Sequence, residues 1–161
     1  MKKTALLFAL TVLIIVIDQW SKLYVDANFY LGESYKVIDG LFNLAYVRNS
    51  GAAFGSFGQS HEWVRLVVLR IVPVLACLWL CYAIIKGKKN TALISLSYAL
   101  ILGGAVGNLI DRFRLDYVID MFDFYQGSAH FATFNVADSA ISVAAGLLVI
   151  DYLIHLKIKR V

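Results

Sequence analysis

Hydrophobic residues gather into four long blocks along the chain, and polar segments separate them. Each block is close to the roughly 20 residues that an α-helix needs to cross the hydrocarbon core of a bilayer. The first block begins at Thr4 and continues in a helical pattern past Ile17 to about Tyr24. The pattern predicts four transmembrane helices, at about 4–24, 63–85, 91–110 and 135–156.

The segment between the first two blocks, about 25–62, has a different pattern. Residues 42–47 alternate between apolar and small or polar side chains, which is typical of a short strand. Asn49-Ser50-Gly51 is a turn signal, and residues 51–55 are apolar and rich in small side chains, so we expect a flexible cover there. A second strand-like stretch runs from Tyr117 to Tyr125. We therefore predict a membrane-embedded all-α bundle with a small extracytoplasmic β-rich cradle.

Composition strengthens the membrane assignment. Hydrophobic residues make up 60% of the 161 residues and charged residues only 16%, whereas soluble domains carry about 25% charged residues. This length favours a single integral membrane domain over 1–161. The net charge of +4 comes without a basic patch interleaved with aromatic residues, so we expect no nucleic-acid partner.

The basic residues predict the orientation in the membrane. The amino end, the 86–90 loop and the carboxyl tail are all rich in Lys or Arg and lack acidic residues. Cytoplasmic flanks of membrane helices carry such an excess, so we place both termini in the cytoplasm. The first block also resembles a secretory signal peptide, but no small-x-small cleavage site follows it. We expect a retained helix, with a cleaved signal as the alternative.

Polar residues that belong to the ends of these helices provide the candidate functional site. With the predicted orientation, all of them fall at the extracytoplasmic side: Asp18, Lys22, Asn108, Asp111, Arg112, Asp120, Asp123, Asn135 and Asp138. Ionisable groups at membrane depth are costly and usually functional or paired. Each also has a structural alternative: Asp18 and Lys22 have the spacing of an intrahelical ion pair, and Asn135 with Asp138 has the spacing of a helix N-cap.

Two carboxylates are the best available set for acid–base chemistry. No zinc motif or Cys/His cluster is present, so we predict neither a metal nor a cofactor. A Ser21–Lys22 pair stays open, although adjacent helical residues point about 100° apart. Two neighbouring carboxylates raise the pKa of one of them, so that one can activate water while the other donates a proton.

Five motifs, in order along the chain, resemble those of lipoprotein signal peptidase, also called signal peptidase II. They are DQWSK at 18–22, RNSGAAF at 48–54, GAVGNLIDR at 104–112, VID at 118–120 and FNVADS at 134–139. Together they extend over nearly the whole chain, which makes the resemblance specific.

The resemblance implies a four-helix membrane peptidase of the bacterial inner membrane. It implies cleavage of prolipoproteins just before their diacylglyceryl-modified cysteine, with Asp120 and Asp138 as the catalytic dyad. The supporting positions it implies are Asn49, Gly51, Asn108, Asp111, Arg112, Asn135, Asp18 and Lys22. Membrane phospholipid is the other expected partner, and we expect a monomer.

Two alternatives accompany this interpretation. Family members often have Phe after the first catalytic Asp, whereas Met121 follows Asp120 here, so Asp123-Phe124 is the rival register. Intramembrane acids are also typical of proton-coupled or ion-conducting proteins, and a non-enzymatic lipid-binding or assembly factor is a further alternative. The clustering of the acids at one face favours the peptidase.

Overall fold

The computed structural model describes residues 2–51, 56–87 and 90–158 and contains four helices long and apolar enough to cross a membrane. The first is α1 (Lys2–Asn28). The second, Glu62–Lys86, joins α2 (Glu62–Leu66), a π-helical turn η2 (Val67–Ile71) and α3 (Val72–Lys86). The last two are α4 (Ala92–Arg114) and α5 (Val136–Ile158). Fold class is thus confirmed for the four helices and the small sheet that accompanies them.

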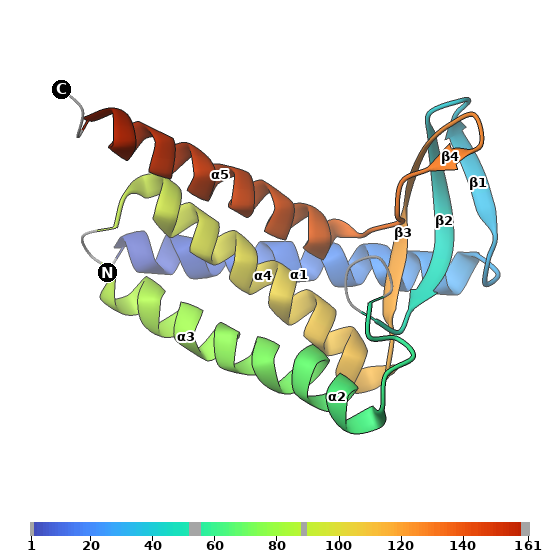
Figure 1. Ribbon diagram of the computed structural model, residues 1–161, viewed down its shortest axis with the longest axis horizontal. Helices are drawn as coiled ribbons and strands as arrows, with labels where there is room; N and C mark the ends of the chain where they lie inside the picture. Colours follow the sequence, from blue (N-terminus) through green and yellow to red (C-terminus); the bar gives the residue numbers. More distant parts are fainter. Residues whose placement is uncertain (1, 52–55, 88–89, 159–161) are drawn as a thin grey trace.

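A four-stranded antiparallel sheet stands across one end of the helices (Figure 1). Its order is β1 (Ser34–Ile38), β2 (Phe42–Asn49), β3 (Val118–Gln126) and β4 (Ala129–His130). Both termini lie at the opposite end of the bundle (Figure 1). This arrangement brings the end of α1, the end of α4 and the start of α5 to the sheet.

The segment predicted as β-rich contributes only half of this sheet. Residues 25–28 continue α1, and β1 and β2 are the strands that lie within 25–62. The other two strands come from the segment between α4 and α5, where a strand was predicted only for 117–125. Register explains the shared sheet: Val47 of β2 pairs with Asp120 of β3, after a bulge between Leu44 and Val47. Most of the predicted flexible cover, residues 52–55, lies outside the described residues.

Two apolar clusters hold the parts together. Within the bundle, Leu102 and Leu109 of α4 pack with Leu80 and Ile84 of α3. At the sheet, Val25 near the end of α1 packs with Ile119 and Met121 of β3. The second cluster attaches the sheet to the first helix, so the position of β3 relative to α1 is set by buried side chains.

Glycines let α4 approach its neighbours closely. A Cβ on Gly104 would lie 2.4 Å from the carbonyl oxygen of Ala137, and one on Gly107 would lie 2.5 Å from Oδ2 of Asp18. Small residues are the usual means of close helix packing in membranes, and Gly103, Gly104 and Gly107 supply them here. The consequence here is functional, because this contact brings polar groups of α1, α4 and α5 together.

The second spanning helix changes its geometry just before Pro73. Proline lacks an N–H, and its ring would clash with the carbonyl four residues earlier, here that of Leu69. Leu69 lies in the π-helical turn η2, which ends two residues before Pro73. The wider turn thus contains the Leu69 carbonyl, to which Pro73 has no N–H to donate and against which its ring would clash in a regular α-helix.

Candidate active site

A cavity of about 290 Å³ opens where α4, α5 and β3 meet. Asp120 of β3 and Asp138 of α5 both line it, together with Asn49, Asn108 and Arg112. Its remaining wall is mostly apolar and is formed by Val118, Phe131, Ala132, Thr133, Phe134, Ile141 and Ser142. Two acidic side chains separated in the chain therefore share one partly apolar cavity.

Amide side chains hold the Asp120 carboxylate from two sides. Asn49 donates to its Oδ2 at 3.0 Å, and Asn135 donates to its Oδ1 at 2.7 Å. Asn135 also donates to the backbone carbonyl of Ile119 at 3.2 Å. Asp120 is only 2% exposed, so these two amides account for much of its local polarity.

Asp138 is positioned by the beginning of α5. Asn135 accepts a hydrogen bond from the backbone N–H of Asp138 at 2.9 Å, which is the N-cap that the sequence spacing predicted. Oδ1 of Asp138 accepts from Asn108 of α4 at 2.8 Å. Among the described residues, Oδ2 of Asp138 receives no hydrogen bond. One asparagine therefore links both acidic residues, and one carboxylate oxygen remains available.

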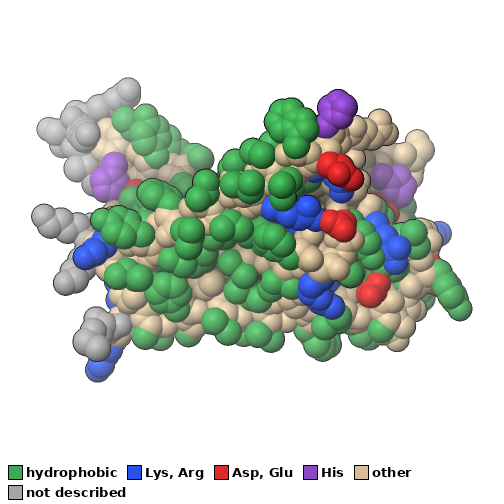
Figure 2. Space-filling model, turned by 90° about the horizontal axis from the view of Figure 1, so that it is seen from below, with side chains coloured by type: hydrophobic (Ala, Val, Ile, Leu, Met, Phe, Trp, Pro, Cys, Tyr) green, Lys and Arg blue, Asp and Glu red, His purple; other side chains and the backbone are tan. Residues whose placement is uncertain are grey.

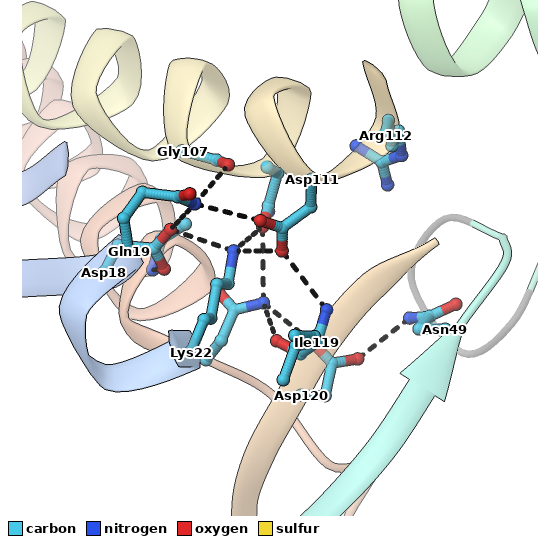
Figure 3. A network of polar contacts seen from close by, with 12 residues as sticks. Asp18, Gln19, Lys22, Asn49, Gly107, Asp111, Arg112, Ile119 and Asp120 are labelled. Carbon is cyan, nitrogen blue, oxygen red and sulfur yellow. Dashed lines mark hydrogen bonds and ion pairs between the residues drawn. The ribbon is translucent and has the colours of Figure 1, made fainter. Parts of the chain in front are cut away.

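Lys22 lies at the centre of the buried network beside the cavity (Figure 3). Its Nζ lies 2.9 Å from carboxylate oxygens of both Asp18 and Asp111, and it donates to Oδ1 of Asn108 at 2.9 Å. The Asp18–Lys22 pair is thus the intrahelical pair that the spacing predicted, but the same ammonium group also joins α1 to α4. Ser21 donates to the backbone carbonyl of Asp18, so its hydroxyl is engaged within its own helix.

The two carboxylates around Lys22 also bind backbone groups. Asp18 accepts from the N–H of Ala137 in the first turn of α5 at 2.9 Å, and Asp111 accepts from the N–H of Ile119 at 3.2 Å. Gln19 donates to Asp111 at 2.9 Å and to the carbonyl of Gly107 at 3.1 Å. These bonds hold the backbone at Ala137 and Ile119, the residues directly before Asp138 and Asp120. Figure 3 shows the bond between Asp111 and Ile119.

Arg112 and Asn49 both bind the backbone of Gly51, just after β2. Arg112 donates to the carbonyl of Gly51 at 3.1 Å, while the N–H of Gly51 donates to Oδ1 of Asn49 at 3.0 Å. The structure thus brings together all ten residues that the resemblance implied, the two acidic residues and the eight supporting positions. Gly51 takes part through its backbone.

Electrostatics separate Asp120 from an ordinary surface acid. The pKa of its carboxyl is raised to about 7, first by burial and then by the negative charge of Asp138. Hydrogen bonds from Asn49 and Asn135 oppose this increase. A carboxyl with a pKa near 7 can hold a proton at neutral pH and release it, which is what general acid–base catalysis needs.

Residues 10–154 match the family model described as signal peptidase II. The chain belongs to the signal peptidase II family. Curated relatives named lipoprotein signal peptidase include one from Syntrophus aciditrophicus, 41% identical over 152 residues, which cover 94% of each chain. Another, from Pasteurella multocida, is 43% identical over 136 residues, 84% of this chain and 81% of its own.

Solved structures agree with this membership. Two structures of bacterial membrane enzymes, at 2.3 Å and 1.9 Å resolution, superpose with TM-scores of 0.81 and 0.78, each at 27% identity. They cover 92% of this chain and 88% and 93% of their own. Signal peptidase II is a family of aspartic peptidases, which confirms the predicted enzyme class. With its four apolar helices, the chain is a bacterial multi-pass membrane protein.

The rival acidic residue, Asp123, lies apart from the cavity. It accepts from Asn43 at 2.9 Å and lies 2.8 Å from Nδ1 of His130. Asp123 lies three positions after Asp120, and side chains alternate along a strand, so the two point to opposite faces of β3.

Some residues near the site were missed by the sequence interpretation. Gln19 stands inside a quoted motif without an assigned role, yet it bridges α1 and α4. The apolar wall residues Phe131, Phe134 and Ile141 carried no chemical signal in the sequence. Arg70 also lies near the site: it donates to the carbonyl of Arg112 and pairs with Asp116.

Proposed function

We propose that this enzyme removes the signal peptide from prolipoproteins by cleaving just before the diacylglyceryl-modified cysteine. Asp120 and Asp138 act as its catalytic dyad. The observation that carries the proposal is the shared cavity. Asp120 and Asp138 both line it, and burial and the charge of Asp138 raise the pKa of Asp120 to about 7. The names of its relatives supply the substrate class.

The surroundings of the two carboxyls support different roles. Asp120 is the protonated member near neutral pH, because burial and a neighbouring negative charge raise its pKa. Asp138 is the ionised member, because it lies in the first turn of α5, where the helix dipole favours negative charge. The two carboxyls share one proton in this scheme.

Hydrolysis then needs no covalent intermediate. Asp138 takes a proton from water through its unbonded oxygen while the water oxygen adds to the scissile carbonyl carbon. Asp120 gives its proton to the carbonyl oxygen, which forms a tetrahedral diol. Collapse of the diol breaks the C–N bond: the proton on Asp138 passes to the leaving nitrogen, and one diol hydroxyl returns its proton to Asp120 as the C=O bond re-forms. The products are the signal peptide with a new carboxyl group and the lipoprotein with a free α-amino group.

The remaining polar residues support the dyad in this proposal. Asn49, Asn108 and Asn135 orient the two carboxylates, and Asp18, Lys22 and Asp111 fix the helices that carry them. Arg112 and Gly51 connect the cavity to the segment after β2. The apolar wall of the cavity suits a substrate that approaches from lipid.

We infer that the sheet is a cradle on the extracytoplasmic surface of the inner membrane, with both termini in the cytoplasm. Basic residues at the opposite end of the bundle, such as Lys2, Lys3 and Lys86, support this orientation. A diacylglyceryl group anchored in the outer leaflet then places the scissile bond at the level of Asp120 and Asp138. The enzyme works as a monomer in this scheme, because both acidic residues come from one chain.

Isosteric substitutions test the dyad. Asp120→Asn and Asp138→Asn should each abolish cleavage while the protein still accumulates in the membrane, seen as uncleaved prolipoprotein. Asp123→Asn is the matched control on the same strand and should retain cleavage. Full cleavage by either dyad variant would overturn the assignment, and loss of cleavage in Asp123→Asn alone would favour the rival register.

A further inference from the structure

A second cavity, of about 630 Å³, lies at the sheet-bearing end of the bundle beside the second spanning helix. It contains none of the residues assigned to the catalytic cavity. Its lining combines two arginines, two acids, one tryptophan and one leucine: Glu62, Trp63, Arg65, Leu66, Arg70 and Asp116. Charges of both signs therefore face a single hollow.

The two arginines use only some of their N–H donors for bonds within the described part of the chain. Arg70 donates to the carbonyl of Arg112 at 2.7 Å and 3.2 Å and forms an ion pair with Asp116. Arg65 makes only one hydrogen bond within the described part of the chain, to the carbonyl of Asp116 at 3.3 Å. Its Nε is buried without a partner among those residues. An arginine carries five N–H donors, so most of those on Arg65 remain for a ligand.

The acids at the rim are open to the surroundings. The side chain of Asp116 is 80% exposed even though it pairs with Arg70, and Glu62 is exposed at the first residue of the helix. Trp63 beside it is 67% exposed. An indole is typical of the interface between water and lipid, and its face attracts cations.

The cavity lies at the end of a spanning helix, at the level expected for lipid headgroups. Glu62 begins the 25-residue span that ends at Lys86, and Arg70 follows eight residues later, about 12 Å along the helix at ~1.5 Å per residue. Figure 2 shows acidic and basic side chains gathered toward this end of the molecule, while hydrophobic side chains cover much of the remaining visible face. The groups that meet this surface in a bilayer are lipid headgroups and the first carbons of their chains.

We propose that this cavity binds the headgroup of a zwitterionic phospholipid with a primary ammonium group, a phosphatidylethanolamine. The phosphodiester lies against Arg65 and the remaining donors of Arg70, since guanidinium groups bind phosphate oxygens through paired N–H donors. The ammonium group lies between Glu62 and Asp116, with the face of Trp63 beside it.

The charge balance favours a zwitterion over an anionic lipid. Two positive and two negative side chains line the hollow. Because Asp116 already pairs with Arg70, a phosphate bound to Arg65 without an accompanying cation would leave Glu62 unmatched. A primary ammonium also donates three hydrogen bonds, whereas a choline headgroup donates none. The order of affinity is therefore ethanolamine first, with glycerol and choline headgroups weaker.

Native mass spectrometry of the full-length protein in detergent tests the order. Phosphatidylethanolamine, phosphatidylglycerol and phosphatidylcholine with identical acyl chains are titrated in turn, and the bound fraction of each is measured. The variants are Arg65→Gln and Glu62→Gln. Arg114→Gln is the matched control, because Arg114 is an exposed arginine near the same end that does not line the cavity.

Each variant has its own expected result. Arg65→Gln should weaken binding of phosphatidylethanolamine and phosphatidylglycerol by roughly tenfold, the effect of losing one charge-assisted hydrogen bond. Glu62→Gln should weaken phosphatidylethanolamine alone, and Arg114→Gln should change nothing. If Arg65→Gln does not fold, Arg65→Lys replaces it and should show a smaller loss for the same two lipids.

Two results would overturn the proposal. Equal affinity of the wild-type protein for the three lipids would exclude a headgroup-specific site. Equal losses in the Arg65 variants and in Arg114→Gln would show that the lipid responds only to net charge. Both results are independent of peptidase activity.

Discussion

Lys22 should contribute more to stability than any exposed lysine of the chain. Its side chain is 2% exposed, and three oxygens lie 2.9 Å from its Nζ. Those oxygens belong to Asp18, Asp111 and Asn108, so all three ammonium protons have an acceptor. Lys22→Met keeps a side chain of similar length but leaves two buried carboxylates without their cation.

The expected cost follows from the burial of that pair. Removing one partner of a buried ion pair typically destabilises a protein by about 3–5 kcal/mol. Two pairs are broken here, but both carboxylates retain other donors: Ala137 and Gln19 for Asp18, and Gln19 and Ile119 for Asp111. We therefore expect Lys22→Met to lower the free energy of unfolding by about 3–5 kcal/mol in total.

Reversible unfolding in mixed detergent micelles measures this difference. Lys36→Met is the control, because Lys36 also lies close to an aspartate, Asp39, at 3.1 Å, but the two side chains are 72% and 86% exposed. Exposed pairs contribute little, so this variant should unfold like the wild type. Similar behaviour of the two variants would refute the reasoning.

A rescue variant separates charge from packing. Adding Asp111→Asn to Lys22→Met removes one of the unpaired charges and should recover part of the lost stability. If the double variant is less stable than Lys22→Met alone, then Asp111 stabilises the fold mainly through Ile119 and Gln19 rather than through Lys22.

Two further predictions concern pH and helix packing. The pKa of Asp120 is about 7, and Asn49 lowers it by donating to the charged form. Peptidase kcat/KM should thus fall as pH rises through about 7, and Asn49→Ala should move this limb to higher pH; an unmoved limb would contradict the role. Gly107→Ala places a Cβ 2.5 Å from Asp18 and should destabilise the fold by about 1–3 kcal/mol in the same unfolding assay. Gly146→Ala has open space and should not.

Sequence patterns predicted which segments form helices and which acidic residues meet. Periodicity and length are local properties, so four apolar blocks could be recognised without the fold. The preference for Asp120 over Asp123 came from the resemblance, because residues 118–119 match the apolar pair of its motif and the distance from Asp111-Arg112 fits; it stays a prediction. Asp123 instead pairs with His130 and Asn43.

The contacts between elements could not be predicted in this way. Lys22 has the spacing of a partner for Asp18, but its bonds to Asp111 and Asn108 depend on how closely α1 and α4 pack. The strand pairing of β2 with β3 depends likewise on a bulge that no turn signal marks. Arg70 points to Arg112 and Asp116 because the end of α4 lies beside η2.

The ammonium group of Lys22 is separated from the proposed dyad by one amide side chain. Lys22 contacts neither Asp120 nor Asp138 directly; it binds Asn108, and Asn108 donates to Asp138. An ammonium group placed directly on the dyad would favour two ionised carboxylates. Amide donors orient the carboxylates while leaving one of them able to keep a proton, and the pKa of Asp120 near 7 agrees with this. The buried cation thus stabilises the bundle from one amide away, and from there its charge lowers the pKa of Asp120 by less than burial and Asp138 raise it.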